Sequence, residues 1–336
     1  MDKILGHMDN LKQKSLDFLE KDIYSNLSGP TMVAWDLTTR CNMFCQHCFN
    51  GSQGGNEYDE LDSSLTQKVI EELIELKINS ICLCGGEPLL KKETLEIIEK
   101  LSQNKISVNM VTNGFLLTEK NINFMAGKLN FLQISIDGAN ATTHDALRNT
   151  KGAFERATSA LKMAIEAKIP SVAVSFCPNR KNYWQLPDYV QVISDIGCRN
   201  IRMMHFLPQS RGLENNELML DAVQQYEFQW LLRDQRQKFP NVKIEYGDPL
   251  EHIYSYVSQG IDATSVEIRP NGDFTISPYL PLAFGNIKRM SIKEAWNKGL
   301  KGAWRNDLTK KLASSIISIY DMSQFNNPWK DTTVVF

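Results

Sequence analysis

Short runs of apolar and β-branched residues alternate with longer amphipathic segments between residues 31 and 206. The six runs are VAWDLT at 33, SICLCG at 80, ISVNMVT at 106, FLQISID at 131, SVAVSF at 171 and NIRMMHF at 200. Each run has the length and composition of a β-strand. Consecutive runs start 25 to 47 residues apart, which leaves room for a helix between them.

Helical spacing marks the segments between these strands. Residues 61–76 (LDSSLTQKVIEELIEL) open with capping residues, and residues 92–104 (KETLEIIEKLSQN) fill the next interval. Apolar residues share one helical face at Leu65, Val69, Leu73 and Leu76, and again at Phe154, Ala157, Leu161, Ala164 and Ile165. Parallel strands need crossover helices, so this alternation predicts an α/β fold with a parallel sheet. Candidate functional residues recur where strands end, which favours a partial (β/α)6 TIM-like barrel.

The pattern changes after about residue 240. Residues 265–277 (SVEIRPNGDFTIS) predict a small C-terminal β-hairpin around an Asn-Gly turn, and residues 291–304 predict a helix with Ser291 as N-cap. At the other end, Ile4, Met8 and Leu11 predict an amphipathic helix that SNLSGP ends at 25–30. We therefore expect an N-terminal extension (1–30), the partial barrel (31–240) and a hairpin-plus-helix extension (241–336).

Composition excludes several classes of function. The 336 residues include 37 Lys and Arg against 39 Asp and Glu, a net charge of -2, so no basic excess favours a nucleic-acid partner. No apolar stretch reaches the roughly 18 residues of a membrane span, and charges interrupt the N-terminus where a signal peptide would be apolar. The sequence predicts a cytoplasmic protein with no membrane partner.

The cysteines are clustered rather than spread. Seven occur, at 41, 45, 48, 82, 84, 177 and 198, which is too few for a disulfide scaffold. Cys41, Cys45 and Cys48 form C-x-x-x-C-x-x-C directly after the first strand. Three thiolates on a short loop can bind three corners of a [4Fe-4S] cluster and leave the fourth iron open. The alternative is a zinc site completed by His47 or another ligand, but the paired C-x-x-C knuckles of zinc ribbons are missing.

A second motif, CGGEPLL at 84–90, directly follows the second strand. Together with the cysteine triplet it resembles the radical S-adenosylmethionine (radical SAM) enzymes. Further matches are TNG at 112–114, SIDG at 135–138, HDALRNTKGAF at 144–154, PQSRG at 208–212, and the segment from NGDFTIS to GNI that ends at 287. The resemblance covers roughly residues 31–300.

The later matches are similar to the branch of peptide maturases that carry a C-terminal SPASM or twitch extension. Such enzymes usually bind auxiliary clusters with C-terminal cysteines, whereas this chain has no cysteine after Cys198. Ser277 stands where many relatives have a cysteine. We expect a single [4Fe-4S] cluster and a cluster-free extension.

The resemblance implies reductive cleavage of S-adenosylmethionine to a 5′-deoxyadenosyl radical, with the protein supplying orientation and exclusion of water. It implies roles for nine residues. Gly85, Gly86, Glu87 and Pro88 would meet the methionyl group, with Glu87 accepting from its ammonium; Ser135 and Arg148 would hold its carboxylate; His47 would lie against adenine; Asn113 and Asp137 would contact ribose or substrate.

Each assignment has a plainer alternative. An isolated glycine pair is a turn, Asn113 and Asp137 are ordinary turn residues, and Arg148 is a helix-end ion pair. His144 is expected as a cap or surface residue. His205, with Met203 and Met204, is expected to pack within a strand.

The cysteines outside the triplet are expected to act as small core residues, which is the usual meaning of such cysteines. These are Cys82, Cys84 and Cys177. The sharper hypothesis is that Cys177 donates a hydrogen atom to a substrate radical, as epimerising relatives require. Asp36 is an alternative substrate contact. Cys177→Ala should then leave S-adenosylmethionine cleavage intact and abolish epimerised product.

The function that follows is modification of a ribosomally synthesised peptide by epimerisation, cross-linking or another C–H activation. The runner-up is an epimerase, dehydratase or dehydrogenase of a small molecule such as an aminosugar or nucleoside, and a third reading is a non-catalytic metal-binding barrel. An electron donor of the flavodoxin or ferredoxin type is implied. The first 30 residues are too few for a leader-binding module, so we expect a helper protein or the extension to capture the peptide.

Overall fold

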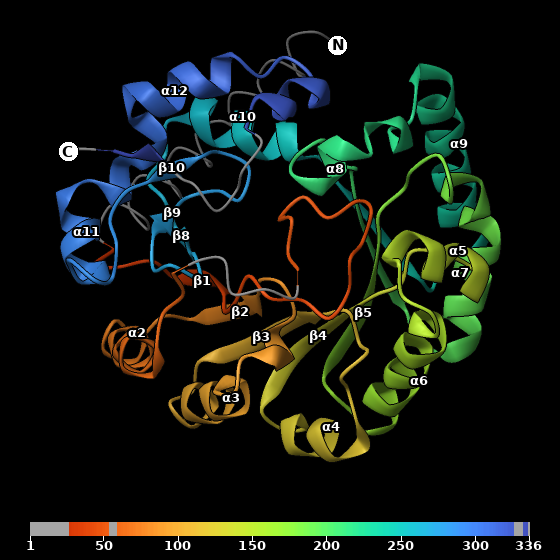
Figure 1. The fold of residues 1–336 in the computed structure, drawn as a ribbon, viewed down its shortest axis with the longest axis horizontal. Helices are drawn as coiled ribbons and strands as arrows, with labels where there is room; N and C mark the ends of the chain where they lie inside the picture. Colours follow the sequence, from red (N-terminus) through yellow and green to blue (C-terminus); the bar gives the residue numbers. More distant parts are fainter. Residues whose placement is uncertain (1–26, 54–58, 326–331, 335–336) are drawn as a thin grey trace, which may run out of the picture.

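The computed structural model describes residues 27–53, 59–325 and 332–334. Within them, one sheet in the order β7-β6-β5-β4-β3-β2-β1-β8-β9 is parallel throughout except for the antiparallel β8–β9 pair. The strands are β1 Met32–Asp36, β2 Ser80–Cys84, β3 Ser107–Thr112, β4 Leu129–Ser135, β5 Ser171–Phe176, β6 Asn200–Met204, β7 Lys243–Gly247, β8 Ser265–Ile268 and β9 Phe274–Thr275. The sheet curves without closing, which makes a partial barrel (Figure 1).

Helices cover the outer face of the curved sheet (Figure 1). They are α2 Ser63–Glu75, α3 Thr94–Gln103, α4 Glu119–Met125, α6 Ala153–Glu166, α7 Leu186–Ile196 and α9 Ala222–Lys238. Helix α5 Ala141–Arg148 packs on α6 beside the C-terminal end of β4. Strand residues alternate between buried and half-buried, as in β2, where Ile81 and Leu83 are fully buried. The buried set packs against the helices in one large core, and the other set faces the concave interior.

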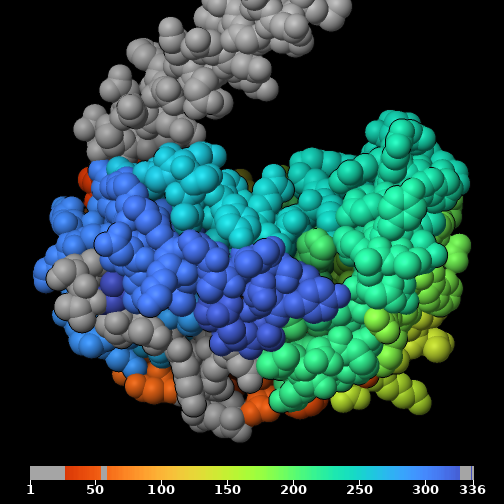
Figure 2. All heavy atoms as spheres, turned by 90° about the horizontal axis from the view of Figure 1, so that it is seen from above, coloured from red at the N-terminus to blue at the C-terminus, as the bar shows by residue number. Residues whose placement is uncertain are grey.

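The remaining elements lie at the open edge and over the C-terminal ends of the strands. They are η1 Pro88–Leu90, η2 Tyr183–Gln185, α8 Arg211–Glu214, η3 Asn216–Leu218, α10 Pro249–Gln259, β10 Leu282–Ala283, α11 Ile292–Lys298, η4 Leu300–Arg305, α12 Asp307–Ser314, η5 Ile319–Gln324 and β11 Thr332–Thr333. Figure 2 shows the C-terminal elements, in blue, reaching across to the green segment that includes α8 and α9. In the described ranges, no helix combines the length and apolar character needed to cross a bilayer.

The sequence predicted the six barrel strands correctly, together with the crossover helices α2, α3 and α6. Asp62 caps α2 through a hydrogen bond from Leu65 N, and Ser291 caps α11 in a capping box with Glu294. The hairpin is also confirmed, but β8 pairs in parallel with β1, so it extends the main sheet. Strand β7 was not predicted, and it pairs with β6 across the expected boundary at residue 240. The three-part division stays a prediction, and the predicted N-terminal helix lies outside the described residues.

A buried charge cluster fixes the hairpin to the barrel. The guanidinium of Arg269, 1% exposed, lies 2.9 Å from Glu267 Oε1 and 3.3 Å from Asp36 Oδ2 on β1. The same guanidinium donates to Pro278 O. In the structure the Asp36 carboxylate pairs with Arg269. The substrate contact suggested for Asp36 stays a prediction.

Arg269→Met should lower the free energy of unfolding by about 3–5 kcal/mol, because two buried carboxylates lose their partner. Urea unfolding measures the change. Lys238→Ala removes an exposed ion pair with Asp234 and should cost less than about 0.5 kcal/mol. Equal losses in the two variants would contradict this account of the cluster.

Candidate functional site

The cysteine triplet lies on the long loop between β1 and α2, which crosses the mouth of the barrel next to α8 (Figure 1). Its base is closed by a hydrogen bond from Cys41 N to Gln53 O (3.0 Å). Cys45 is buried, Cys41 and Cys48 are half-buried, and all three thiols are unbridged. They share a small apolar cluster with Met43, Ala153 and Phe115.

Hydrogen-bond donors face two of the three sulfur atoms. Cys41 Sγ accepts from Met43 N (3.4 Å) and from Asn113 Nδ2 (3.7 Å), and Cys45 Sγ accepts from Arg148 Nη1 (3.7 Å). Burial raises the pKa of Cys41 to about 12 and raises the pKa of Cys45 as well. Metal binding must therefore displace protons from these thiols, and the donors then stabilise the thiolates. In the ranges that the structure covers, no three His, Cys, Asp or Glu side chains converge on a single-ion position.

The Gly-Gly-Glu-Pro segment packs directly on the base of the cysteine loop. Gly86 N donates to Thr38 O (2.7 Å) and Glu87 N donates to Arg40 O (2.8 Å). A Cβ on Gly86 would lie 2.1 Å from Arg40 O, and Gly85 has a φ of +125°. The two glycines therefore allow two backbone segments to approach closely within the protein. Their expected contact with a methionyl group stays a prediction.

Glu87 joins the ends of β2 and β3. Its side chain is fully buried, and its oxygens accept from Thr112 Oγ1 (2.7 Å), Asn113 N (2.9 Å) and Leu89 N (3.2 Å). Burial raises the pKa of Glu87, and these hydrogen bonds oppose the shift. Pro88 follows as the first residue of η1. A contact of Glu87 with a ligand ammonium stays a prediction.

Asp137 is the centre of the site. Its Oδ2 lies 2.5 Å from Arg148 Nη2 and 3.2 Å from His47 Nε2, and its Oδ1 accepts from Cys177 N (2.8 Å). Burial alone would raise the pKa of Asp137, but Arg148 and His47 outweigh it and hold that pKa far below its usual range. Arg148 thus forms the helix-end ion pair that was the alternative to a ligand-binding role. It also donates a hydrogen bond to Cys45 Sγ.

Three buried nitrogen atoms in this network have no hydrogen-bond partner among the described residues. They are Arg148 Nε, His47 Nδ1 and His144 Nε2. Buried polar atoms are normally satisfied, so these atoms fit a polar ligand held beside the cysteine loop. The residues present therefore suit the cofactor that the resemblance implies.

The other expected residues lie near the same mouth. Asn113, at the end of β3, donates to Asn42 Oδ1 (2.9 Å) in the cysteine loop as well as to Cys41. Ser135, at the end of β4, accepts from Ser175 Oγ (3.2 Å) on β5. Direct contacts thus connect Asn113, Asp137 and Arg148 to the cysteine loop, of which His47 is a part, whereas Ser135 faces the barrel interior.

His144 corrects a sequence-based expectation. It was expected as a cap or surface residue, but its side chain is fully buried on α5, and its Nδ1 accepts from Asp137 N (2.9 Å). Burial, together with the nearby Arg148 charge, lowers the pKa of His144 to about 4. Neutral His144 therefore orients the backbone of Asp137. Only the motif match had marked this stretch, and nothing in it distinguished a buried histidine from a surface one.

Arg211 is a site residue to which the sequence analysis gave no role, although it lies in the PQSRG match at 208–212. It is 5% exposed at the start of α8, and it donates to Cys45 O (2.8 Å) and Ser52 O (2.7 Å). Its guanidinium also stacks over the Phe44 ring at 3.8 Å. One side chain thus holds both limbs of the cysteine loop. A contact across more than 150 residues leaves no trace in local spacing.

The remaining cysteines and the β6 residues have mixed surroundings. Cys82 and Cys84 are half-buried on the concave face of β2, and Cys198 is buried. Met203 packs in the core as expected, but Met204 is 41% exposed. His205 lies beyond the end of β6, where its Nε2 is 2.6 Å from Tyr246 OH.

Arg211→Lys should weaken retention of iron, because an ammonium cannot bond both carbonyls and stack on Phe44 at once. The loss of about 3 kcal/mol of loop-fixing interactions should at least halve the iron left per chain after a chelator challenge. Arg305→Met, which removes a half-exposed ion pair with Asp262, is the matched control. Unchanged iron content in the lysine variant would show that the Arg211 guanidinium is not needed to hold the cysteine loop.

His144 should make stability depend on pH. Its pKa is about 4 in the folded chain and about 6.5 when unfolded, so the unfolded chain binds more protons between these values. Stability should therefore fall as pH drops from 6.5 towards 4, by up to about 3 kcal/mol from this residue. His144→Asn keeps an acceptor for Asp137 N and does not titrate. Urea unfolding across this range should show a flatter profile for the variant, and parallel profiles would contradict the assignment.

Comparison with known proteins bears on these residues. Residues 35–193 match the radical SAM superfamily. The AdoMet-dependent heme synthase of Methanosarcina barkeri is 25% identical over 295 residues, which cover 80% of this chain and 82% of that protein. The mycofactocin maturase MftC of Mycolicibacterium smegmatis is 30% identical over 209 residues, which cover 61% of this chain and 53% of that protein. This chain thus spans about half the length of that relative.

A solved structure shares the fold. The crystal structure of Streptococcus suis SuiB bound to precursor peptide SuiA has a TM-score of 0.62 with this chain at 14% identity, covering 89% of this chain and 67% of that one. The likeness extends beyond residue 193 into the C-terminal elements.

Proposed function

We propose that this chain, of which residues 35–193 match the radical SAM superfamily, is an enzyme that removes a hydrogen atom from a residue of a ribosomally made peptide. One observation carries the proposal. The cysteine loop, the buried Asp137–Arg148 pair and nitrogen atoms of Arg148 and His47 without a protein partner meet at the C-terminal mouth of the partial barrel. That is where parallel α/β folds place their chemistry.

The cofactor roles follow from these positions. A bound [4Fe-4S] cluster with S-adenosylmethionine would supply the electron and the hydrogen-abstracting group. Cys41, Cys45 and Cys48 would hold the cluster, and Arg148 Nε would donate to the methionyl carboxylate. Asp137 keeps the Arg148 guanidinium charged and fixed. Because the extension has Ser277 at the position where a cysteine ligand was expected, we propose a single cluster.

Cys177 remains our candidate for a hydrogen donor. Its backbone is tied to Asp137, and its side chain packs between that site and the apolar residues Phe206 and Met219. Burial raises the pKa of the Cys177 thiol, so it carries its hydrogen at neutral pH. Transfer of that hydrogen to a substrate carbon radical forms a C–H bond and leaves a thiyl radical. One electron and one proton from the external donor would restore the thiol.

The relatives divide on the substrate class. A named maturase and a fold neighbour crystallised with a precursor peptide favour a peptide, and the heme synthase keeps a small molecule as the second candidate. We place the enzyme in a reducing cytoplasm, because seven unbridged thiols suit such a compartment. A flavodoxin or ferredoxin would donate the electron.

Anaerobic reconstitution tests the cofactor chemistry. The wild-type chain should hold about four iron and four sulfide, and it should release 5′-deoxyadenosine from S-adenosylmethionine when reduced. Cys45→Ala should lose both properties. Cys198→Ala, a buried cysteine outside the loop, is the control that should keep them. About one zinc without iron, or no 5′-deoxyadenosine, would overturn the proposal.

The substrate is tested with a peptide encoded beside the gene, in deuterated water, followed by mass spectrometry. One deuterium at an inverted α-carbon would mean epimerisation, and Cys177→Ala should abolish it. Loss of two hydrogens would mean cross-linking or oxidation. An unchanged peptide with continuing S-adenosylmethionine cleavage would favour the small-molecule candidate.

A further inference from the structure

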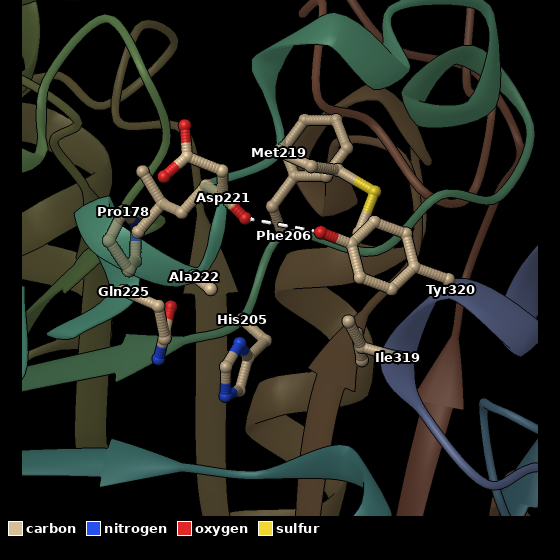
Figure 3. Close-up of a pocket in the computed structure, with 10 residues that line it drawn as sticks. Pro178, His205, Phe206, Met219, Asp221, Ala222, Gln225, Ile319 and Tyr320 are labelled. Carbon is tan, nitrogen blue, oxygen red and sulfur yellow. Dashed lines mark hydrogen bonds between the residues drawn. The ribbon is translucent and has the colours of Figure 1, made fainter.

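A pocket of about 200 Å³ opens at the C-terminal ends of β5 and β6. Figure 3 shows Pro178 and His205 beyond these strands, Phe206 and Met219 on the connection that follows β6, and Tyr320 opposite them. Tyr320 belongs to η5, and its hydroxyl donates to Leu220 O (3.3 Å). Barrel, connection and C-terminal extension therefore build the pocket together.

The pocket is one layer of side chains away from the candidate cofactor site. Phe206 and Met219 line it and also pack in an apolar cluster with Leu147, the residue before Arg148. Cys177 packs against the same cluster. A group held in the pocket thus lies next to the residues assigned to hydrogen transfer.

A short hydrogen-bond chain sets the polarity of the pocket wall. Gln225 Nε2 donates to Tyr246 OH (3.2 Å), and that hydroxyl lies 2.6 Å from His205 Nε2. In one of the two tautomers of neutral His205, the Tyr246 hydroxyl donates to Nε2 and the imidazole proton is on Nδ1. Burial lowers the pKa of His205, which keeps the ring neutral.

Other polar groups of the pocket already form hydrogen bonds or ion pairs with protein atoms. Asp221 caps α9 through Val223 N and Gln224 N and pairs with Arg180. The Tyr320 hydroxyl is used on Leu220 O. Within the described ranges, His205 Nδ1–H and Gln225 Oε1 have no protein partner, and both side chains contact Tyr246. One donor and one acceptor are thus left side by side beside an apolar wall.

We propose that this pocket binds one residue of the peptide substrate that has an apolar side chain. The side chain would lie among Phe206, Met219 and Ile319, while a backbone carbonyl accepts from His205 and a backbone N–H donates to Gln225. A peptide unit offers that pair of groups. Whole small-molecule ligands usually occupy roughly 300–1,000 Å³, so 200 Å³ suits a single side chain of a longer substrate. The inference rests on the proposed peptide function and narrows it.

The test uses N-acetyl-L-leucine N-methylamide as probe, with uridine and glucosamine beside it, on reconstituted enzyme with S-adenosylmethionine under anaerobic conditions. Saturation-transfer NMR measures binding. The capped leucine should bind. His205→Phe should weaken its binding at least about tenfold, whereas His205→Asn, which keeps a donor at the Nδ1 position, should stay within about threefold of wild type. Met219→Trp, which fills the pocket, should abolish binding.

Trp230→Ala changes an exposed side chain of α9 outside the pocket and is the control that should bind the probe as wild type does. Thermal melting and iron content establish that each variant is folded. Equal binding by the asparagine and phenylalanine variants, or binding that survives Met219→Trp, would overturn the proposal. So would binding of uridine or glucosamine in place of the capped leucine. If the wild-type enzyme binds none of the probes but still releases 5′-deoxyadenosine, the pocket assignment is wrong and the proposed cofactor chemistry is unaffected.

Discussion

The buried carboxylate of Asp137 is the interaction on which the mouth of this barrel depends. Three separate pieces of the chain meet on this residue: α5 with Arg148 and His144, the cysteine loop with His47, and the segment after β5 with Cys177. An ionised carboxylate is costly to bury unless it is paired and hydrogen-bonded, and here both oxygens and the backbone N–H have partners. Because the charge needs all of these partners, it fixes their positions relative to one another.

The C-terminal elements are part of the same construction. The hairpin extends the main sheet beyond β1, and the Arg269 cluster fixes it there. Further along, η5 reaches the connection after β6 and completes a pocket wall. A segment without a cysteine therefore still shapes the space where the proposed substrate would sit.

Periodicity and motifs predicted the elements of this fold but not its long-range contacts. Six strands, the Asn-Gly hairpin and the caps at Asp62 and Ser291 follow from local rules, and local rules suffice for them. Strand β7 has a short, half-exposed pattern that local reasoning does not separate from a loop. Motifs gathered the residues of the site without their partners: Asp137 and Arg148 were both singled out, but nothing in sequence showed that they pair. The burial of His144 and the reach of Arg211 depend on tertiary packing alone.

The contacts of Arg211 with both limbs of the cysteine loop have a consequence for biosynthesis. The ligand loop leaves the ribosome early, yet the side chain that joins its two limbs comes 166 residues after Cys45. A nascent chain therefore carries three thiols on an unfixed loop until Arg211 has also been made. Insertion of the proposed cluster into the fixed loop would have to follow that point of synthesis.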